Sequence, residues 1–153
     1  MDKVYAKNLR DMVWEVRKYL GDNWPTPNTE GSLAYAVTEV GEAIDADLRS
    51  RRPDDKRNNN RNVSVEHELA QAAMMLLTAL GPEWEPSRYF DEIVNYDLPD
   101  IAADVALAYR ESDAAYWDWA EHAEYALSAI DIYCVGVDCY LKQVLDDAKE
   151  KWG

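Results

Sequence analysis

Apolar residues recur at helical spacing along almost the whole chain, whereas the strict alternation typical of strands is nearly absent. Between Leu33 and Leu48, for example, apolar residues follow one another at intervals of four, three, four and four. This spacing keeps them on one face of a helix for about five turns. The pattern therefore predicts an all-α fold.

Glycine, proline and capping residues divide this pattern into separate helices. The expected elements are a helix from about Val4 to Leu20, a second helix that starts at Asn28, Thr29 or Ser32 and continues through Leu48, a polar loop from Ser50 to Asn62, a third helix from Asn62 or Ser64 to Leu80, an irregular segment from Glu83 to Asp97, a fourth helix from Pro99 to Arg110, and a helical region from Ala114 to Lys151. The last region is either one bent helix or two. We expect one domain, residues 1–153, formed by a bundle of about four to six helices with an extended C-terminal helical region.

The chain is strongly acidic, with 30 Asp and Glu residues against 16 Lys and Arg residues and a net charge of −14 at pH 7. Such a surface repels the phosphates of a nucleic-acid duplex, so we expect no direct duplex binding. A nucleotide site remains compatible with this charge, because bound metal ions reverse its sign locally.

Three features of the sequence predict a cytoplasmic location: the charged N-terminus, the interrupted apolar runs and the small number of cysteines. The N-terminus carries charges where a signal peptide has an apolar core. Asp131 and Asp138 interrupt the longest candidate for a membrane span, so we expect no membrane association. Two cysteines, Cys134 and Cys139, are too few for a secreted disulfide scaffold.

Two quartets of residues carry the most informative chemistry of the sequence. Residues 39–42 are Glu-Val-Gly-Glu and residues 68–71 are Glu-Leu-Ala-Gln, each inside a predicted helix. Residues three apart share a helix face, so each quartet directs two oxygen-bearing side chains toward one point. The second quartet repeats the register of the first, and antiparallel packing of the two helices would bring both quartets to one site. Carboxylate oxygens are the ligands that Mg²⁺ prefers.

The surroundings of Glu39 and Glu42 favour such a site over a solvated acidic face. Both lie off the centre of the apolar stripe, beside Tyr35 and several alanines. Small neighbours allow another helix to approach, which indicates a partly enclosed acidic slot that a cation would neutralise. A single ExxE pair usually marks a solvated face; the matched register of two pairs favours the slot.

The two quartets, joined by a basic loop, resemble the MazG-like branch of the all-α nucleoside triphosphate pyrophosphohydrolases over about residues 24–81. That family carries ExxE on one helix and ExxD on the next. The resemblance implies a homodimer or tetramer that binds Mg²⁺, or alternatively Mn²⁺, and hydrolyses a nucleoside or deoxynucleoside triphosphate to monophosphate and pyrophosphate. Glu39, Glu42 and Glu68 match the metal ligands of the family and are the candidate catalytic residues. Gln71 replaces the expected aspartate, and its carbonyl oxygen can bind a metal without adding charge.

Two further carboxylates are candidates for supplying the charge that Gln71 lacks. Asp100 and Asp104 share one face of the predicted fourth helix, where they are possible additional metal ligands. The alternative is that they are ordinary helix-start charges on a solvated face.

Basic residues are candidates for binding the triphosphate. Six of the 16 lie between positions 49 and 61, an island of positive charge that suits phosphates and an acidic neighbouring subunit equally well. Lys149 either reaches the nucleotide, as the resemblance implies, or offsets the dipole of the last helix. The candidate phosphate-binding residues are Arg49, Arg52, Lys56, Arg57 and Lys149.

A function of another class also fits the composition. An acidic helical protein without catalysis could act as a nucleotide sensor, or could imitate nucleic-acid charge in a basic groove of a partner protein. A mimic spreads its charge over the surface, whereas an enzyme concentrates charge around a metal.

The remaining chemistry of the sequence predicts structural roles. His67 and His122 fit no zinc-ligand spacing. Tyr125, Tyr133 and Tyr140 recur at intervals of eight and seven residues, which is typical of packing between helices.

Overall fold

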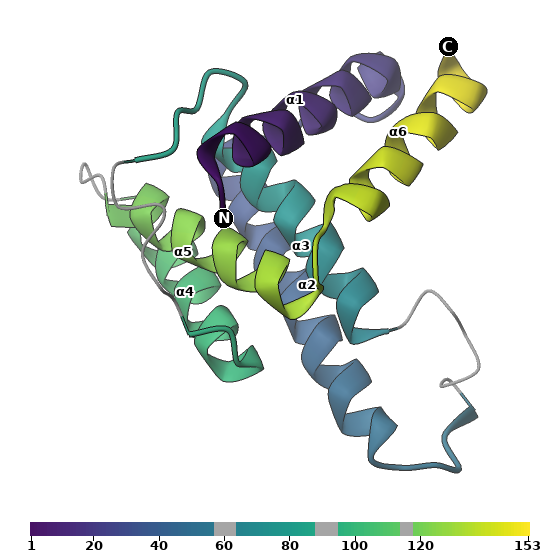
Figure 1. Cartoon of the computed structure of the whole chain (residues 1–153), viewed down its shortest axis with the longest axis vertical. Helices are drawn as coiled ribbons and strands as arrows, with labels where there is room; N and C mark the ends of the chain where they lie inside the picture. Colours follow the sequence, from purple (N-terminus) through teal and green to yellow (C-terminus); the bar gives the residue numbers. More distant parts are fainter. Residues whose placement is uncertain (57–63, 88–94, 114–117) are drawn as a thin grey trace.

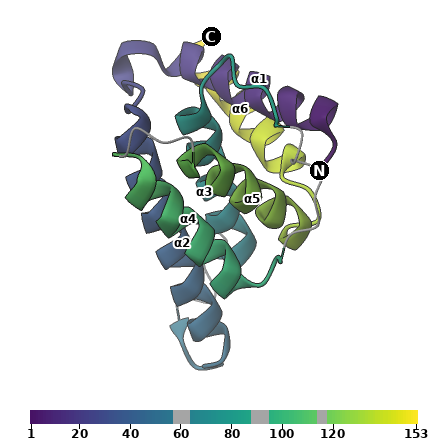
Figure 2. The same ribbon diagram turned by 90° about the vertical axis from the view of Figure 1, so that its left-hand side faces the viewer.

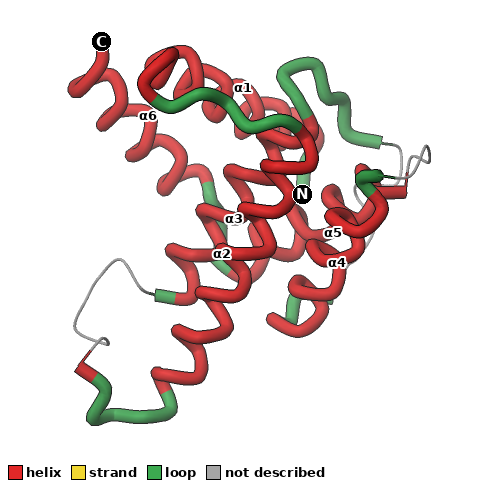
Figure 3. Tube along the Cα trace, turned by 180° about the vertical axis from the view of Figure 1, so that it is seen from behind, coloured by secondary structure: helices red, strands yellow, loops and turns green. Residues whose placement is uncertain are grey.

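The computed structural model describes residues 1–56, 64–87, 95–113 and 118–153, and all regular secondary structure in these ranges is helical (Figure 1; Figure 3). This agrees with the all-α prediction. The elements are α1 (Lys3–Leu20), the short 3₁₀ helix η1 (Gly21–Asn23), α2 (Thr29–Ser50), α3 (Val65–Leu80), α4 (Leu98–Glu111), α5 (Asp118–Tyr133) and α6 (Asp138–Trp152).

Side-chain caps fix the starts of the two helices that carry the quartets. Asn28 Oδ1 accepts a hydrogen bond from the backbone N–H of Gly31 at 2.7 Å at the start of α2. Ser64 Oγ accepts from the backbone N–H of His67 at 3.1 Å at the start of α3. Each cap satisfies an N–H group that has no partner inside the helix. Of the starts that the sequence left open, the structure selects Asn28 and Ser64.

Four helices form the central bundle. α2 and α3 run antiparallel, α4 packs against α2, α5 packs against α3, and α4 and α5 pack against each other (Figure 2). α1 and α6 pack against one another and against α3 (Figure 1). The six α-helices of the described ranges all contribute to one buried apolar cluster. None of the helices in the described ranges combines the length and the apolar composition that a membrane span needs.

Alanines on α2 face the core, which corrects one prediction about its apolar stripe. Ala36 and Ala43 are fully buried, whereas Ile44 and Leu48 are 36% and 50% exposed. The prediction that Leu33–Leu48 forms one apolar face against the core is therefore wrong for its C-terminal half. The reason is that this half of α2 extends beyond α4 and α5, so no helix of the described chain covers its larger side chains (Figure 2).

The C-terminal region consists of two helices, joined by a short link at residues 134–137. Two residues of the link have positive φ, Val135 (54°) and Gly136 (101°), and this conformation ends α5. Asp131 Oδ1 accepts hydrogen bonds from the backbone N–H of Val137 at 3.0 Å and from the Tyr5 hydroxyl at 2.9 Å. The first bond ties the link to α5, and the second ties α5 to α1.

Substitutions on α5 should change the stability of the protein according to how deeply each side chain is buried. Leu127 is fully buried, whereas Ile132 on the same helix is 44% exposed. Leu127→Ala should lower the free energy of unfolding by about 2–5 kcal/mol, because it leaves a cavity in the core. Ile132→Ala should change it by less than about 0.5 kcal/mol. Urea unfolding followed by circular dichroism measures both values, and equal losses would contradict the placement of α5.

Candidate functional site

Three carboxylates meet between α2 and α3. Glu39 and Glu42 on α2 and Glu68 on α3 each place one oxygen so that all three oxygens lie within 4.8 Å of one another. Glu68 is only 4% exposed, Glu39 is half-buried and Glu42 is exposed. The antiparallel packing of the two helices thus brings the two quartets to one place. We call these three residues the acidic cluster.

Gln71 faces the acidic cluster. It lies one helical turn after Glu68, and its amide orientation is assigned from its hydrogen-bond network. The amide nitrogen donates to Glu39 Oε2 at 2.8 Å and to Glu68 Oε2 at 3.1 Å, and the amide oxygen accepts from His67 Nε2 at 3.2 Å. In this arrangement the glutamine supplies N–H donors to two carboxylates. Binding a metal ion through Gln71 would require the amide to turn and present its oxygen.

Proximity and burial raise the pKa of every carboxyl group in the acidic cluster. Burial is the largest cause for Glu39, where a hydrogen bond with Glu68 opposes it and the charge of Glu42 adds to it. The hydrogen bond with Glu68 is the largest cause of the raised pKa of Glu42. Burial is the largest cause for Glu68, followed by its hydrogen bond with Glu39. The site therefore favours protons or a cation over three free charges.

His67 and Tyr140 extend the site, whereas both were expected from the sequence to have structural roles. Their rings meet edge to face, with centroids 5.2 Å apart. Burial is the largest cause that raises the pKa of Tyr140, and the charges of Glu39 and Glu68 raise it further. His67 carries a usable signal, because it lies four residues before Gln71 on the same helix face. Tyr140 carries none, since its position depends on the link between α5 and α6.

The candidate metal ligands on α4 are not part of the acidic cluster. Asp104 Oδ1 lies 3.4 Å from His122 Nδ1 on α5. Burial raises the pKa of Asp104, contact with His122 lowers it, and the charge of Asp100 raises it. In the described part of the chain, neither Asp100 nor Asp104 belongs to a group of three or more side chains close enough to hold one metal ion. Asp104 instead belongs to the contact between α4 and α5.

The candidate phosphate-binding residues lie away from the acidic cluster along their helices. Arg49 is buried, its Nε donates to Asp45 at 3.0 Å, and it is seven residues, or about 10 Å, beyond Glu42 along α2. Lys149 pairs with Glu15 at 3.2 Å, which joins the end of α6 to α1. The other candidates follow α2: Arg52 and Lys56 are exposed, and Arg57 lies outside the described residues. Among described residues, no ion pair joins a lysine or arginine to the acidic cluster.

Comparisons with known proteins find no match for this chain among family models, curated proteins or solved structures. Three carboxylate oxygens at this spacing can hold one hard divalent cation and leave further coordination positions for water or for phosphate oxygens.

The raised pKa values predict that the metal-free protein loses stability as pH increases. The folded state holds protons on Glu39, Glu42 and Glu68 more tightly than the unfolded chain does. Their stabilising contribution is therefore complete below the ordinary glutamate pKa and is lost as pH rises through the raised values. In EDTA, Glu68→Gln should be more stable than wild type at pH 8, and this difference should shrink toward pH 5.

Glu66→Gln is the matched control for this experiment. Glu66 lies in the same first turn of α3 but is exposed and outside the acidic cluster. Its loss removes the same charge together with a favourable interaction with the helix N-terminus, so it should not stabilise the protein. The relevant measurement is urea unfolding at several pH values. If the free energy of unfolding changed with pH equally in the two variants, the acidic cluster would not be a source of instability at high pH.

Proposed function

We propose that this protein is a Mg²⁺-dependent nucleoside triphosphate pyrophosphohydrolase that cleaves an NTP or dNTP to monophosphate and pyrophosphate. The observation that carries the proposal is the acidic cluster, in which two antiparallel helices bring three carboxylate oxygens within 4.8 Å around the buried Glu68. The resemblance of the two quartets to MazG-like enzymes supports the same reaction. Mn²⁺ has similar oxygen preferences and is the alternative ion.

The residues of the cluster suit hydrolysis of a phosphoanhydride. Glu39, Glu42 and Glu68 would hold the ion, which supplies charge neutralisation and polarisation of the phosphate oxygens when it is bound. Water attacks phosphorus, the bond between the α and β phosphates breaks, and the water proton passes to a carboxylate.

Charge for the triphosphate would come from residues near the end of α2 and from α6. Arg52 and Lys56 are exposed and are the more accessible candidates in the described chain. Arg49 and Lys149 would have to leave Asp45 and Glu15 respectively to reach a phosphate. The proposed roles of Arg49 and Lys149 therefore depend on ligand-induced rearrangement of these two ion pairs.

A second candidate function is a sensor that binds a metal–nucleotide complex without cleaving it. The observation in its favour is the Gln71 amide, whose nitrogen faces Glu39 and Glu68 where the family carries a carboxylate. One negative charge fewer should weaken metal binding. The geometry gives less support to a nucleic-acid mimic, because such a protein gains nothing from a carboxylate as buried as Glu68.

The oligomeric state and the cellular location stay predictions. A homodimer or tetramer, as the resemblance implies, would provide cover for Ile44 and Leu48, the exposed apolar residues of α2. The cytoplasmic location is an expectation from the sequence alone.

Metal binding is the first test of the proposal. Mg²⁺ or Mn²⁺ should raise the melting temperature of the wild-type protein at pH 7.5, because an ion that binds only the folded state stabilises it by mass action. The increase should be smaller at pH 5.5, where protons compete for the same carboxylates. Glu68→Gln should abolish most of the increase and Glu150→Gln, on the exposed face of α6, should retain it. An identical response of both variants would exclude the acidic cluster as the metal site.

Catalysis is tested by pyrophosphate release from a panel of NTPs and dNTPs with Mg²⁺ or Mn²⁺. Loss of a metal-bound carboxylate in Glu39→Gln should reduce the rate by at least about 100-fold, the upper end of the range found when groups that merely support a metal ligand are removed. Gln71→Asp should bind the metal more tightly and raise the rate, since it adds charge to the cluster. Gln143→Glu adds the same charge on the exposed face of α6, and it should change neither the metal affinity nor the rate.

The outcomes separate the candidate functions. If neither wild type nor Gln71→Asp releases pyrophosphate, the enzyme proposal fails. If both are inactive but bind nucleotide only with the metal, the sensor proposal holds. Activity that survives Glu39→Gln would instead show that the reaction takes place elsewhere on the protein.

A further inference from the structure

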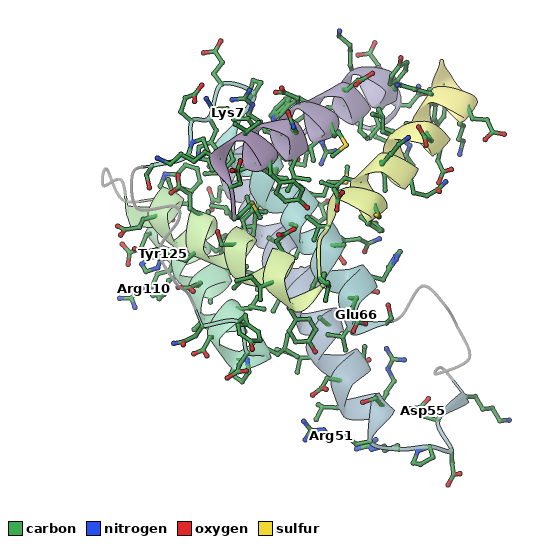
Figure 4. All side chains as sticks on the ribbon, in the orientation of Figure 1. Lys7, Arg51, Asp55, Glu66, Arg110 and Tyr125 are labelled. Atoms are coloured by element: carbon green, nitrogen blue, oxygen red, sulfur yellow. The ribbon has the colours of Figure 1, made fainter. Side chains whose placement is uncertain are left out.

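A pocket of about 300 Å³ lies between the N-terminal end of α3 and the link that joins α5 to α6. Its α3 side is formed by Ser64, Glu66, His67 and Ala70, and the opposite side by residues 134–140. Figure 4 shows Glu66 at this end of α3, near the link. The volume is at the low end of the range of about 300–1,000 Å³ found for small-molecule sites.

The pocket is adjacent to the acidic cluster. His67 and Tyr140 line it, and both also contact Gln71. Gln71 in turn donates to Glu39 and Glu68. One side chain therefore separates the pocket from the carboxylates. A ligand whose phosphates are bound at the cluster would have its remaining part within reach of this pocket.

We infer that this pocket holds the nucleoside part of the triphosphate, an inference that rests on the proposed function. Its walls combine two aromatic rings, the small residues Ala70 and Gly136, and the polar groups of Ser64 and Glu66. Aromatic rings stack with the faces of nucleobases. A hydroxyl and a carboxylate accept hydrogen bonds from base N–H groups or sugar hydroxyls.

The charge of the pocket decides which end of the substrate it takes. The described residues that line it include no lysine or arginine, and Glu66 adds a negative charge. A phosphate placed there would be repelled by Glu66, whereas an uncharged base and sugar would not. The triphosphate therefore extends toward the acidic cluster and its metal, and the nucleoside points toward the α5–α6 link.

The two cysteines make this inference testable without disturbing the cluster. Both line the pocket, but Cys139 is exposed, whereas burial raises the pKa of Cys134 to about 12. Alkylation by iodoacetamide requires the thiolate, so Cys139 should react first. A bound nucleoside should shield Cys139 from the reagent.

The experiment measures the alkylation rate of Cys139 in the whole protein by peptide mass spectrometry. The probes are Mg²⁺ complexes of non-hydrolysable α,β-methylene nucleoside triphosphates with each of the four RNA bases, and Mg²⁺ tripolyphosphate as the control without a nucleoside. At a ligand concentration of ten times Kd, at least one nucleotide should slow the reaction by about tenfold. Mg²⁺ tripolyphosphate should leave the rate unchanged, although it binds at the same cluster.

Pocket-filling variants give a second measurement. Cys139→Trp should weaken binding of the nucleotide while leaving the Kd of Mg²⁺ tripolyphosphate unchanged, and Cys139→Ser should preserve both. If nucleotides and tripolyphosphate both bind but no nucleotide protects Cys139 and Cys139→Trp binds normally, the pocket inference is wrong and the proposed function stands. If none of these compounds binds in the presence of Mg²⁺, the proposed function fails and the inference fails with it.

Discussion

The close approach of α2 and α3 is the constraint on which the fold and the site both depend. Alanines such as Ala36, Ala43 and Ala72 are fully buried on these helices, and such small side chains allow two backbones to pack closely. The same packing forces Glu39 and Glu42 toward Glu68, although like charges repel. The burial of apolar surface between the two helices therefore holds the three carboxylates close together although their charges repel one another.

Gln71 reduces this electrostatic cost in the metal-free protein. Its amide nitrogen donates to Glu39 and Glu68, which an aspartate in its place could not do. A fourth carboxylate would bind a metal more strongly but would add repulsion whenever the metal is absent. Position 71 therefore balances the stability of the metal-free fold against metal affinity, and this chain has the residue that favours the fold.

Local features of the sequence predict the parts of this structure that depend on a single helix or on two helices adjacent in the chain. Caps such as Ser64, the helical periods and the register of the quartets are of this kind. Contacts set by the assembled bundle were not predictable: the exposure of Leu48, the pairing of Asp104 with His122, and the approach of Tyr140 to Gln71. Each of these depends on how far one helix overlaps another or on the direction in which the link turns.

The two sides of the site are held in place differently: the link between α5 and α6 positions Tyr140, whereas packed helices position the acidic cluster. Val135 is a β-branched residue with φ of 54°, a left-handed conformation that costs on the order of 1–2 kcal/mol for a residue with a side chain. The hydrogen bonds of Asp131 hold this link in place, whereas the acidic cluster is carried by two directly packed helices. Relaxation of the link would act as a hinge that moves Tyr140 and the wall of the pocket while Glu39, Glu42 and Glu68 stay together. Strain in the link therefore bears on the position of Tyr140 and the pocket wall, whereas the positions of the three carboxylates depend on the packing of α2 against α3.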